Sequence, residues 1–476
     1  MIRISLSILL FITSLVVVGQ GRVLSLQECI DIALDNNLRV KRGYYALRSS
    51  EIGLQQSKMS LLPSFNLGSN VGKNFGRAIN PVTNAFINRN SDVLNLQGSS
   101  FVTLFNGFRL TNTVRQSSKE LDASNYELTK AKNDVILNVV SFYTTVIFNK
   151  ELLANARFQL TSGQEQLDRI KKQVAAGQLP MSNELNQEAQ VASAEVNLIN
   201  QENALNLSLL QLKQAMQVQG SEQLDVVVPS IDPEDLILEN SPEQIFQIAL
   251  QSMPEIKAAL LRVESAELAL RSAKGGLYPR LSLSAAAQSN YSSISNTQRT
   301  AIDGFEVSTT PFGVVAGSNT PVFAYQPVYR VVSSDYKAGE QLSDNIFKAL
   351  SLQLNIPLFN GMQARSGVQR AAISKELAAV NQQEAENTLR QSIETAYNDA
   401  VAASKTYAAS LKQENARGEA YRMTKQRFEI GASNYVEFRL AETDLVQARS
   451  DLARAKFNFI FRKKLLDFYQ GKPIGF

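Results

Sequence analysis

The sequence contains no histidine and no tryptophan, and its single cysteine is Cys29. Without histidine the chain cannot form a Ser-His-Asp triad or a histidine-ligated metal site, and one thiol cannot build a thiolate cluster or a disulfide framework. The net charge of +4 is small for 476 residues and gives no argument for nucleic-acid binding. We therefore expect no catalytic residues, no cofactor, no metal site and no nucleic-acid partner, so an enzyme is the least favoured class.

Long apolar runs are also absent after residue 21. Residues 1–21 have the pattern of a secretory signal peptide, because Arg3 precedes an almost unbroken apolar run and small residues favour cleavage after Gly21. A buried N-terminal helix is the alternative interpretation. No later segment approaches the roughly 18 apolar residues that a membrane-spanning helix needs, so none is expected. Cys29 lacks the small preceding residues of a lipidated cysteine and is expected to be a buried thiol.

What the sequence does contain is a duplication. The tetrapeptide Leu-Phe-Asn-Gly occurs at 104–107 and at 358–361, a shift of 254 residues (358 − 104), and a shift of 216 applies upstream. Matched pairs are Glu51 and Glu267, Pro63 and Pro279, Gly177 and Gly431, and Glu188 and Glu442. We predict two structural repeats, at 22–219 and 243–476, joined by a linker at 220–242. The 38 extra residues (254 − 216) fall in a large polar loop at about 289–347 in the second repeat.

Each repeat shows the order helix, strand pair, long helical stretch. Residues 25–61 have a helical pattern, which ends before Pro63. Alternating polar and apolar residues then predict a strand, and alternation returns at 92–105 and, in the second repeat, at 350–356. Strands of about ten residues suit a membrane barrel, but they equally suit a soluble sandwich hairpin, so this pattern alone decides neither.

The helical stretches have a heptad pattern. No proline lies between residues 108 and 176, and only Gly163 interrupts the stretch. Core positions follow a four-three spacing at Leu128, Ala131, Val135, Asn138, Phe142, Val146, Asn149, Leu153, Ala156 and Leu160, and beyond Gly177 at Leu185, Ala189, Ala192, Val196 and Ile199. This predicts coiled-coil packing of a rod about 100 Å long. Two shorter helices joined by a loop are the alternative.

Together these features resemble the TolC family of outer-membrane efflux proteins over essentially the whole mature chain. The resemblance rests on the helix-to-strand junctions Leu61-Leu62-Pro63 and Leu277-Tyr278-Pro279, the two Leu-Phe-Asn-Gly segments and the glycine turns. It implies an α/β membrane protein whose protomer contributes four β-strands to a trimeric 12-stranded outer-membrane barrel, continued by a long α-helical coiled-coil tunnel. The strand–helix junction residues would be Pro63, Asn106, Gly107, Pro279, Asn360 and Gly361.

The resemblance also implies a function. The chain would be the outer-membrane exit duct of a tripartite efflux or type I secretion system in a Gram-negative bacterium. It would conduct substrates passively, as a homotrimer in contact with outer-membrane lipid, from an inner-membrane pump of the RND or ABC type and a periplasmic adaptor (membrane fusion protein). No phosphate-binding loop follows a strand, so energy would come from the pump. The alternative is a trimeric coiled-coil surface stalk or adhesin without conduction.

Site residues follow from the family's pattern. The helical tips that contact the adaptor would be Gly177, Gln178, Leu179, Gly431, Ala432 and Ser433. The pore constriction would involve Glu437 and Asn183 at carboxylate positions of the family, Leu440 at a second such position, Ser433 in place of an arginine, and Glu184 as a compensating acid. In threefold repetition Glu437 would form an anionic ring. The simpler alternatives are ordinary helix C-caps at the glycines and a solvated helix face for Glu437.

Overall fold

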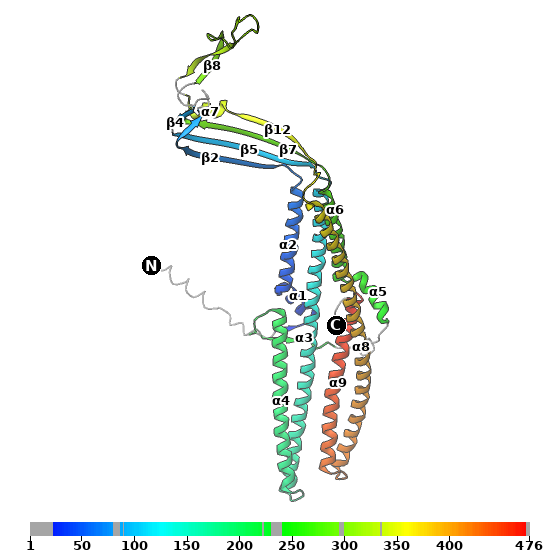
Figure 1. Ribbon diagram of the computed structural model, residues 1–476. Helices are drawn as coiled ribbons and strands as arrows, with labels where there is room; N and C mark the ends of the chain where they lie inside the picture. The colour runs from blue at the N-terminus through cyan, green and yellow to red at the C-terminus, as the bar shows by residue number, and fades with distance from the viewer. Residues whose placement is uncertain are drawn as a thin grey trace, which may run out of the picture. The chain divides into compact units, whose positions relative to one another are not determined.

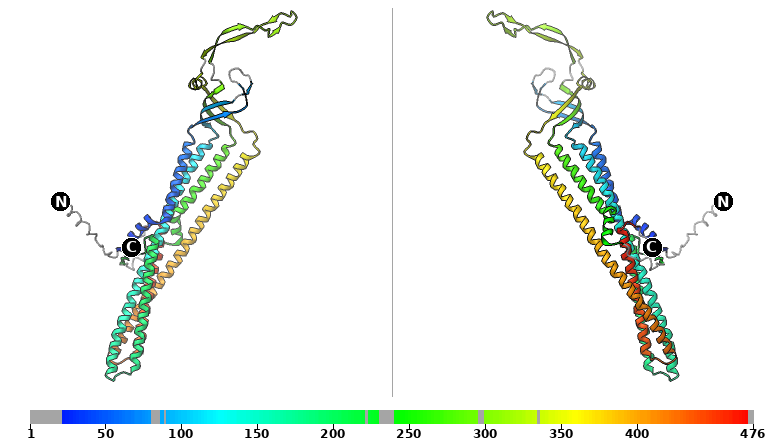
Figure 2. Two further views of the ribbon diagram at one scale, coloured as in Figure 1. Left: turned by 90° about the vertical axis from the view of Figure 1, so that its left-hand side faces the viewer. Right: turned by 90° about the vertical axis from the view of Figure 1, so that its right-hand side faces the viewer.

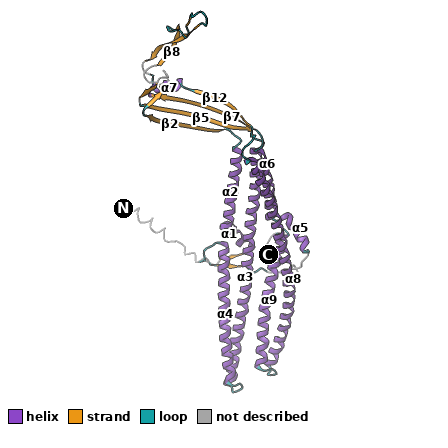
Figure 3. Cartoon of the chain, viewed as in Figure 1, coloured by secondary structure: helices purple, strands orange, loops and turns teal. Residues whose placement is uncertain are grey.

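A computed structural model describes residues 22–79, 86–88, 90–220, 223–229, 240–294, 299–333 and 336–472. The predicted signal peptide lies outside these residues, as do parts of the predicted linker and of the predicted loop. The chain divides into two compact units (Figures 1 and 3). The helical unit comprises Met1–Gly53, Ser117–Ala266 and Ser374–Phe476, and the sheet unit comprises Leu54–Gln116 and Glu267–Ile373.

The helices and strands of the described residues have the following bounds. The helices are α1 (Leu26–Asn36), α2 (Leu38–Met59), α3 (Arg109–Ala175), α4 (Met181–Met216), α5 (Pro242–Ser252), α6 (Pro254–Gly275), α7 (Ala338–Asp344), α8 (Gln363–Glu429) and α9 (Tyr435–Tyr469). The strands are β1 (Arg22–Leu24), β2 (Ser64–Asn74), β3 (Arg77–Ile79), β4 (Phe86–Asn88), β5 (Ser91–Phe105), β6 (Leu224–Val226), β7 (Arg280–Ser292), β8 (Arg299–Val307), β9 (Gly313–Val314), β10 (Pro321–Val322), β11 (Tyr325–Ser333) and β12 (Phe347–Asn355).

The two sequence offsets reappear in the bounds of these elements. Helices α2 and α6 differ by 216 residues at both ends (254 − 38 and 275 − 59), and the starts of β2 and β7 differ by the same number (280 − 64). Helices α3 and α8 both contain 67 residues and differ by 254 at both ends (363 − 109 and 429 − 175). At 1.5 Å per residue each of these two helices is about 100 Å long.

The first long helical pattern is two helices instead of one. Ser25 caps α1 and forms a capping box with Glu28, as its sequence position suggests. The chain then breaks at Asn37, whose backbone is extended and whose side chain accepts a hydrogen bond from the Arg39 amide. By contrast α3 runs unbroken through Gly163, so the alternative of two shorter helices there is wrong.

The segment at 289–347 is more structured than the polar loop that we predicted. Strand β7 continues to Ser292, and strands β8 to β11 and helix α7 follow before β12 begins at Phe347. Strands β8 and β11 pair with each other, and β9 pairs with β10. The serine, asparagine and glycine content suggested a loop, but the alternating Val, Tyr and Phe residues form a ladder.

Two apolar cores hold the helical unit together. In the first, α1 packs against α3 and α4 through residues that include Cys29, Ala33, Val139 and Leu212. In the second, α5 packs against α8 and α9 through Ile245, Ala249, Ile393 and Leu466, which occupy the matching positions of the other repeat. Cys29 is fully buried, and this burial raises the pKa of its thiol to about 12. In Figure 2 the α3–α4 and α8–α9 pairs each form an antiparallel hairpin.

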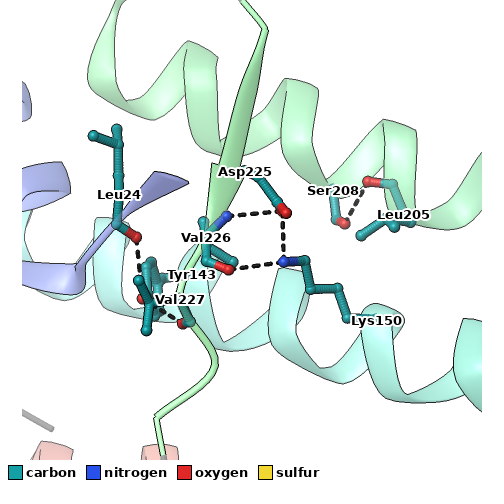
Figure 4. Close-up of polar contacts among 8 residues, drawn as sticks. All are labelled: Leu24, Tyr143, Lys150, Leu205, Ser208, Asp225, Val226 and Val227. Carbon is teal, nitrogen blue, oxygen red and sulfur yellow. Dashed lines mark hydrogen bonds and ion pairs between the residues drawn. The ribbon is translucent and has the colours of Figure 1, made fainter. Parts of the chain in front are cut away.

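Strands β1 and β6 form a short parallel ladder that packs beside α3 (Figure 4). The buried Tyr143 hydroxyl donates to the Val227 carbonyl at 2.7 Å and lies 3.4 Å from the Leu24 carbonyl. Lys150 donates to the Val226 carbonyl at 2.7 Å and pairs with the Asp225 carboxylate at 2.5 Å. Burial, with nearby negative charge, raises the pKa of Tyr143 to about 12.

Among the described residues, none of the helices combines the length and apolar character that a membrane span requires.

Candidate functional site: a two-faced sheet and two helical tips

The main sheet is antiparallel with the strand order β12-β7-β5-β2. Residues directly opposite each other in neighbouring strands share a face. The rung Phe65, Ser100, Ala285 and Leu350 therefore lies on one face, which we call the apolar face. Its large side chains Phe65, Leu67, Leu350, Leu352 and Leu354 are 61–78% exposed.

Lys73 and Lys348 also lie on the apolar face, both near the end of the sheet that is distant from the helix junctions. At this end of the apolar face, a lysine can bury its aliphatic stem along apolar surface and keep its ammonium group in water.

The opposite face carries amides and hydroxyls, and we call it the polar face. The rung Asn70, Asn95 and Asn290 crosses three strands on this face, and Gln97 lies opposite Gln288. Further members are Asn66, Ser99, Ser282, Ser284, Ser351 and Gln353. A sheet that is apolar on one side and rich in Asn, Gln and Ser on the other is suited to separate lipid from water.

The sheet is open at both sides within one chain. Strands β12 and β2 each have one hydrogen-bonded neighbour among the described residues, so each leaves one row of backbone groups unpaired. Such edges are templates for pairing with another chain.

The predicted junction residues lie where sheet strands meet helices. Pro63 and Pro279 directly precede β2 and β7. Asn106 accepts a hydrogen bond from the Leu110 amide at 3.3 Å, and Asn360 makes the matching contact with Ala364 at 3.5 Å. Both asparagines lie three residues before their helices and accept from an amide in the first turn of α3 or α8, which is a capping contact.

Gly107 and Gly361 share a left-handed backbone, with φ of +66° and +61°. Their surroundings differ. A Cβ on Gly107 would lie 2.5 Å from the Gly275 carbonyl oxygen and 2.8 Å from Tyr278 Cβ, whereas a Cβ on Gly361 would meet nothing within 4 Å. The first junction is therefore filled within the chain, and the second is open.

Both predicted tips are short turns built on glycine. Gly177 and Gly431 have φ of +74° and +77°. The Gln178 amide bonds to the Gln173 carbonyl at 2.9 Å, and the Ala432 amide bonds to Arg427 at 2.8 Å, so both turns have Schellman geometry. Gln178 and Ala432 are exposed, and Leu179 and Ser433 are half-buried.

Glu437 is tied into the first turn of its own helix. Its carboxylate accepts hydrogen bonds from the Ser433 hydroxyl at 2.6 Å and from the side-chain amide nitrogen of Asn434 at 3.2 Å. The side-chain oxygen of Asn434 in turn accepts from the backbone amide of Glu437 at 2.8 Å and caps the helix. Glu437 remains exposed, as does Leu440. Asn183 and Glu184 lie in the first turn of α4, and within the described residues no hydrogen bond or ion pair joins them to Glu437.

Sequence reasoning missed a buried polar cluster between the two helical hairpins. Glu442 is only 3% exposed, accepts a 2.6 Å hydrogen bond from the Ser162 hydroxyl, and pairs with Arg439. Beside it the buried Gln187 donates to the Gly163 carbonyl at 2.9 Å.

The Tyr435 hydroxyl donates to the other end of Gln187. Burial and the Glu442 charge raise the pKa of Tyr421 beside this cluster. Gln166 has a buried side-chain nitrogen without a hydrogen-bond partner among the described residues. The signal that could have revealed the cluster is Glu442 itself, a carboxylate one helical turn before the apolar Leu445 on α9.

Groups of three or more metal-ligating side chains are not found among the described residues.

The sequence and the fold both match known proteins. A model of the outer membrane efflux protein family matches residues 29–217 and 245–459. The outer membrane efflux protein BepC of Brucella suis biovar 1 is 21% identical over 361 residues, which cover 75% of this chain and 67% of BepC.

Solved structures give the same fold. A CusC structure aligns with a TM-score of 0.73 at 14% identity, covering 96% of this chain and 93% of CusC. The Campylobacter jejuni CmeC outer membrane channel aligns with a TM-score of 0.70 at 17% identity, covering 94% and 86% of the two chains. The family consists of channels, which argues against a surface stalk or adhesin. With most of its length matched, this chain belongs to the outer membrane efflux protein family, the TolC-like channels of the Gram-negative outer membrane.

Proposed function

We propose that three copies of this chain form one exit duct, which conducts substrates passively from an inner-membrane pump and a periplasmic adaptor to the cell exterior. The observation that carries this proposal is the four-stranded sheet with one apolar face, one polar face and two unpaired edges. A duct of this kind needs no catalytic group, and we propose none.

The edges require partners. Each unpaired backbone group costs several kcal/mol in hydrocarbon, so a sheet can be stable there only if its edges are closed. Pairing β12 of one copy with β2 of the next would close three sheets into twelve strands. The apolar face would then contact lipid, and the polar face would line a water-filled lumen.

An exposed stripe on α4 also calls for a neighbour. Leu185, Val196 and Ile199, three of the predicted heptad core positions, are 54–64% exposed in the single chain. Ile373, Leu377 and Val380 form a similar exposed stripe on α8. Burying such stripes against helices of adjacent copies would complete a helical tunnel with coiled-coil packing.

The joint between β5 and β7 supplies a template for the joint between copies. Within the chain, Ser99 lies opposite Ala286. The 254-residue offset relates Ser99 on β5 to Gln353 on β12, and the 216-residue offset relates Ala286 on β7 to Asn70 on β2. By analogy, Gln353 of one copy would lie opposite Asn70 of the next copy. This register is specific enough to test.

The constriction and the tips remain part of the proposal. Glu437 would form an anionic ring near the tips, with Asn183, Glu184, Leu440 and Ser433 around it. The turns at residues 177–179 and 431–433 would contact the adaptor. The hydrogen bonds from Ser433 and Asn434 to Glu437 support the anionic ring, because they fix the Glu437 carboxylate close to the turn that precedes α9.

The test is a disulfide between copies. We expect Asn70→Cys combined with Gln353→Cys to give covalent dimers and trimers after mild oxidation in outer membranes, since directly opposite strand residues can satisfy disulfide geometry. The native thiol does not interfere because Cys29 is fully buried.

Ser64→Cys with Gln353→Cys is the matched control, six residues out of register on the same strand, and should stay monomeric on denaturing gels. The crosslinked trimer should also conduct ions in planar bilayers. Absence of crosslinks in the first pair, or a trimer that never conducts, would refute the duct.

A further inference from the structure

The 289–347 segment contains a two-stranded ribbon, β8 and β11, which Figure 1 shows as a long extension ending in the small β9–β10 hairpin. In its ladder Tyr325 lies opposite Val307, Pro327 opposite Phe305, and Tyr329 opposite Ile302. A register shift between Val328 and Tyr329 keeps these three pairs on one side. We call this side the ribbon's apolar face.

The two sides of the ribbon differ sharply in polarity. The five large side chains of the apolar face, Ile302, Phe305, Val307, Tyr325 and Tyr329, are 50–75% exposed. The other side carries the Gln326–Glu306 rung and an ion pair between Arg330 and Asp303 at 3.4 Å. Such segregation is the pattern of a sheet with one covered side and one side in water.

Lipid is a poor cover for this face. Strands β8 and β11 pair only with each other among the described residues, so both outer rows of backbone groups are unpaired. Hydrocarbon does not tolerate such rows, nor the charges of Glu306 and Arg330. A protein surface can cover one side and leave the edges and the charged side hydrated.

The size of the face favours a partner that is already held nearby. The five side chains expose apolar surface on the order of 500 Å², less than the roughly 800 Å² per partner of a free-standing interface. A small face is sufficient when the partners are tethered, because tethering gives effective concentrations in the millimolar range. Copies of the same ribbon in one trimer meet this condition. An isolated two-stranded ribbon is also marginally stable in water, so each ribbon gains from the contact.

We propose that the apolar faces of the three ribbons pack against one another, forming a protein collar on the exterior side of the channel. This rests on the trimer of the proposed function. The occupant of each apolar face is thus a second copy of residues 299–333.

The experiment uses single cysteines and a short bis-maleimide in intact outer membranes. Tyr325→Cys and Phe305→Cys lie on the apolar face, and their sequence neighbours Gln326→Cys and Glu306→Cys are matched controls on the other side. Because each chain has one reactive thiol, the reagent joins two chains, and we expect at least a tenfold higher yield of covalent dimers from each apolar-face variant than from its control. The use of two pairs guards against one substitution that unfolds the ribbon, and limited proteolysis reports on its folding.

The outcomes separate the collar from the duct. If the sheet crosslink between residues 70 and 353 forms but both apolar-face variants remain single and react with maleimide as fast as their controls, the collar is wrong and the duct stands. If the apolar-face cysteines are shielded only in whole cells, or crosslink to a different protein, the occupant is an external partner and the collar is again wrong. Failure of the sheet crosslink would instead refute the trimer.

Discussion

Glu188 and Glu442 occupy matched positions 254 residues apart, yet their surroundings are opposite. Glu188 is exposed and forms a solvated ion pair with Lys171 at 3.2 Å. Glu442 is buried, with Arg439 and Ser162 as its partners. A repeat therefore fixes where a residue stands on its helix but leaves open whether a neighbouring hairpin covers it. This is why the sequence pairing alone could not identify Glu442 as a buried group.

We expect Glu442→Gln to destabilise the helical unit by roughly 3 kcal/mol, because Arg439 would keep a buried charge without its counter-ion. Glu188→Gln should cost less than about 1 kcal/mol, since exposed ion pairs contribute little. Thermal unfolding followed by helical circular dichroism measures both. Combined Arg439→Met and Glu442→Met substitutions should recover most of the loss. Equal effects of the two single variants would show that the Glu442 charge is solvated after all.

At the scale of elements, periodicity predicted the long helices, the interruptions at Gly177 and Gly431 and the strands of the sheet well, because each depends on local residues. It failed where distant residues decide. At the break after Asn37 the Leu38 amide donates to the side chain of the distant Gln217 at 3.1 Å, and the ribbon depends on pairing between β8 and β11 across the β9–β10 tip. The heptad prediction for α4 was wrong for the single chain: α4 buries another face there, which includes Gln187, Val191 and Ala194. The predicted core positions are all exposed, namely Leu185, Ala189, Ala192, Val196 and Ile199.

The two junction glycines give an element-scale prediction. Gly107→Ala should impair folding of the protomer itself, since the new Cβ would collide with the Gly275 backbone. Gly361→Ala should leave the protomer folded, at a cost of about 1 kcal/mol for its left-handed backbone, and impair trimer formation. By the 216-residue offset, the surface that Gly361 would meet in the next copy is Met59 to Leu62. Native gel mass and protease resistance distinguish the two effects; similar behaviour of both variants would contradict this assignment.

At the scale of the whole molecule, the proposed trimer would bring together three exposed Glu437 carboxylates, and therefore three negative charges. We expect Glu437→Gln to reduce the preference of the reconstituted channel for cations over anions several-fold, because the anionic ring would be lost. Reversal potentials in a salt gradient measure this preference. Glu429→Gln, a change of the same charge just before the tip, is the control and should have little effect. If Glu437→Gln leaves the preference for cations over anions unchanged, Glu437 is a solvated residue on a helix surface and not part of an anionic ring.

The equal lengths of α3 and α8 constrain how such a protein can change in evolution. Both helices contain 67 residues, and their return helices contain 36 and 35. Adding a heptad to one helix would advance a tip by about 10 Å and shift the register against its neighbours. An envelope of different thickness would therefore require coordinated insertions in four helices at once. We therefore expect relatives with longer or shorter helical hairpins to have gained or lost whole heptads in both repeats together.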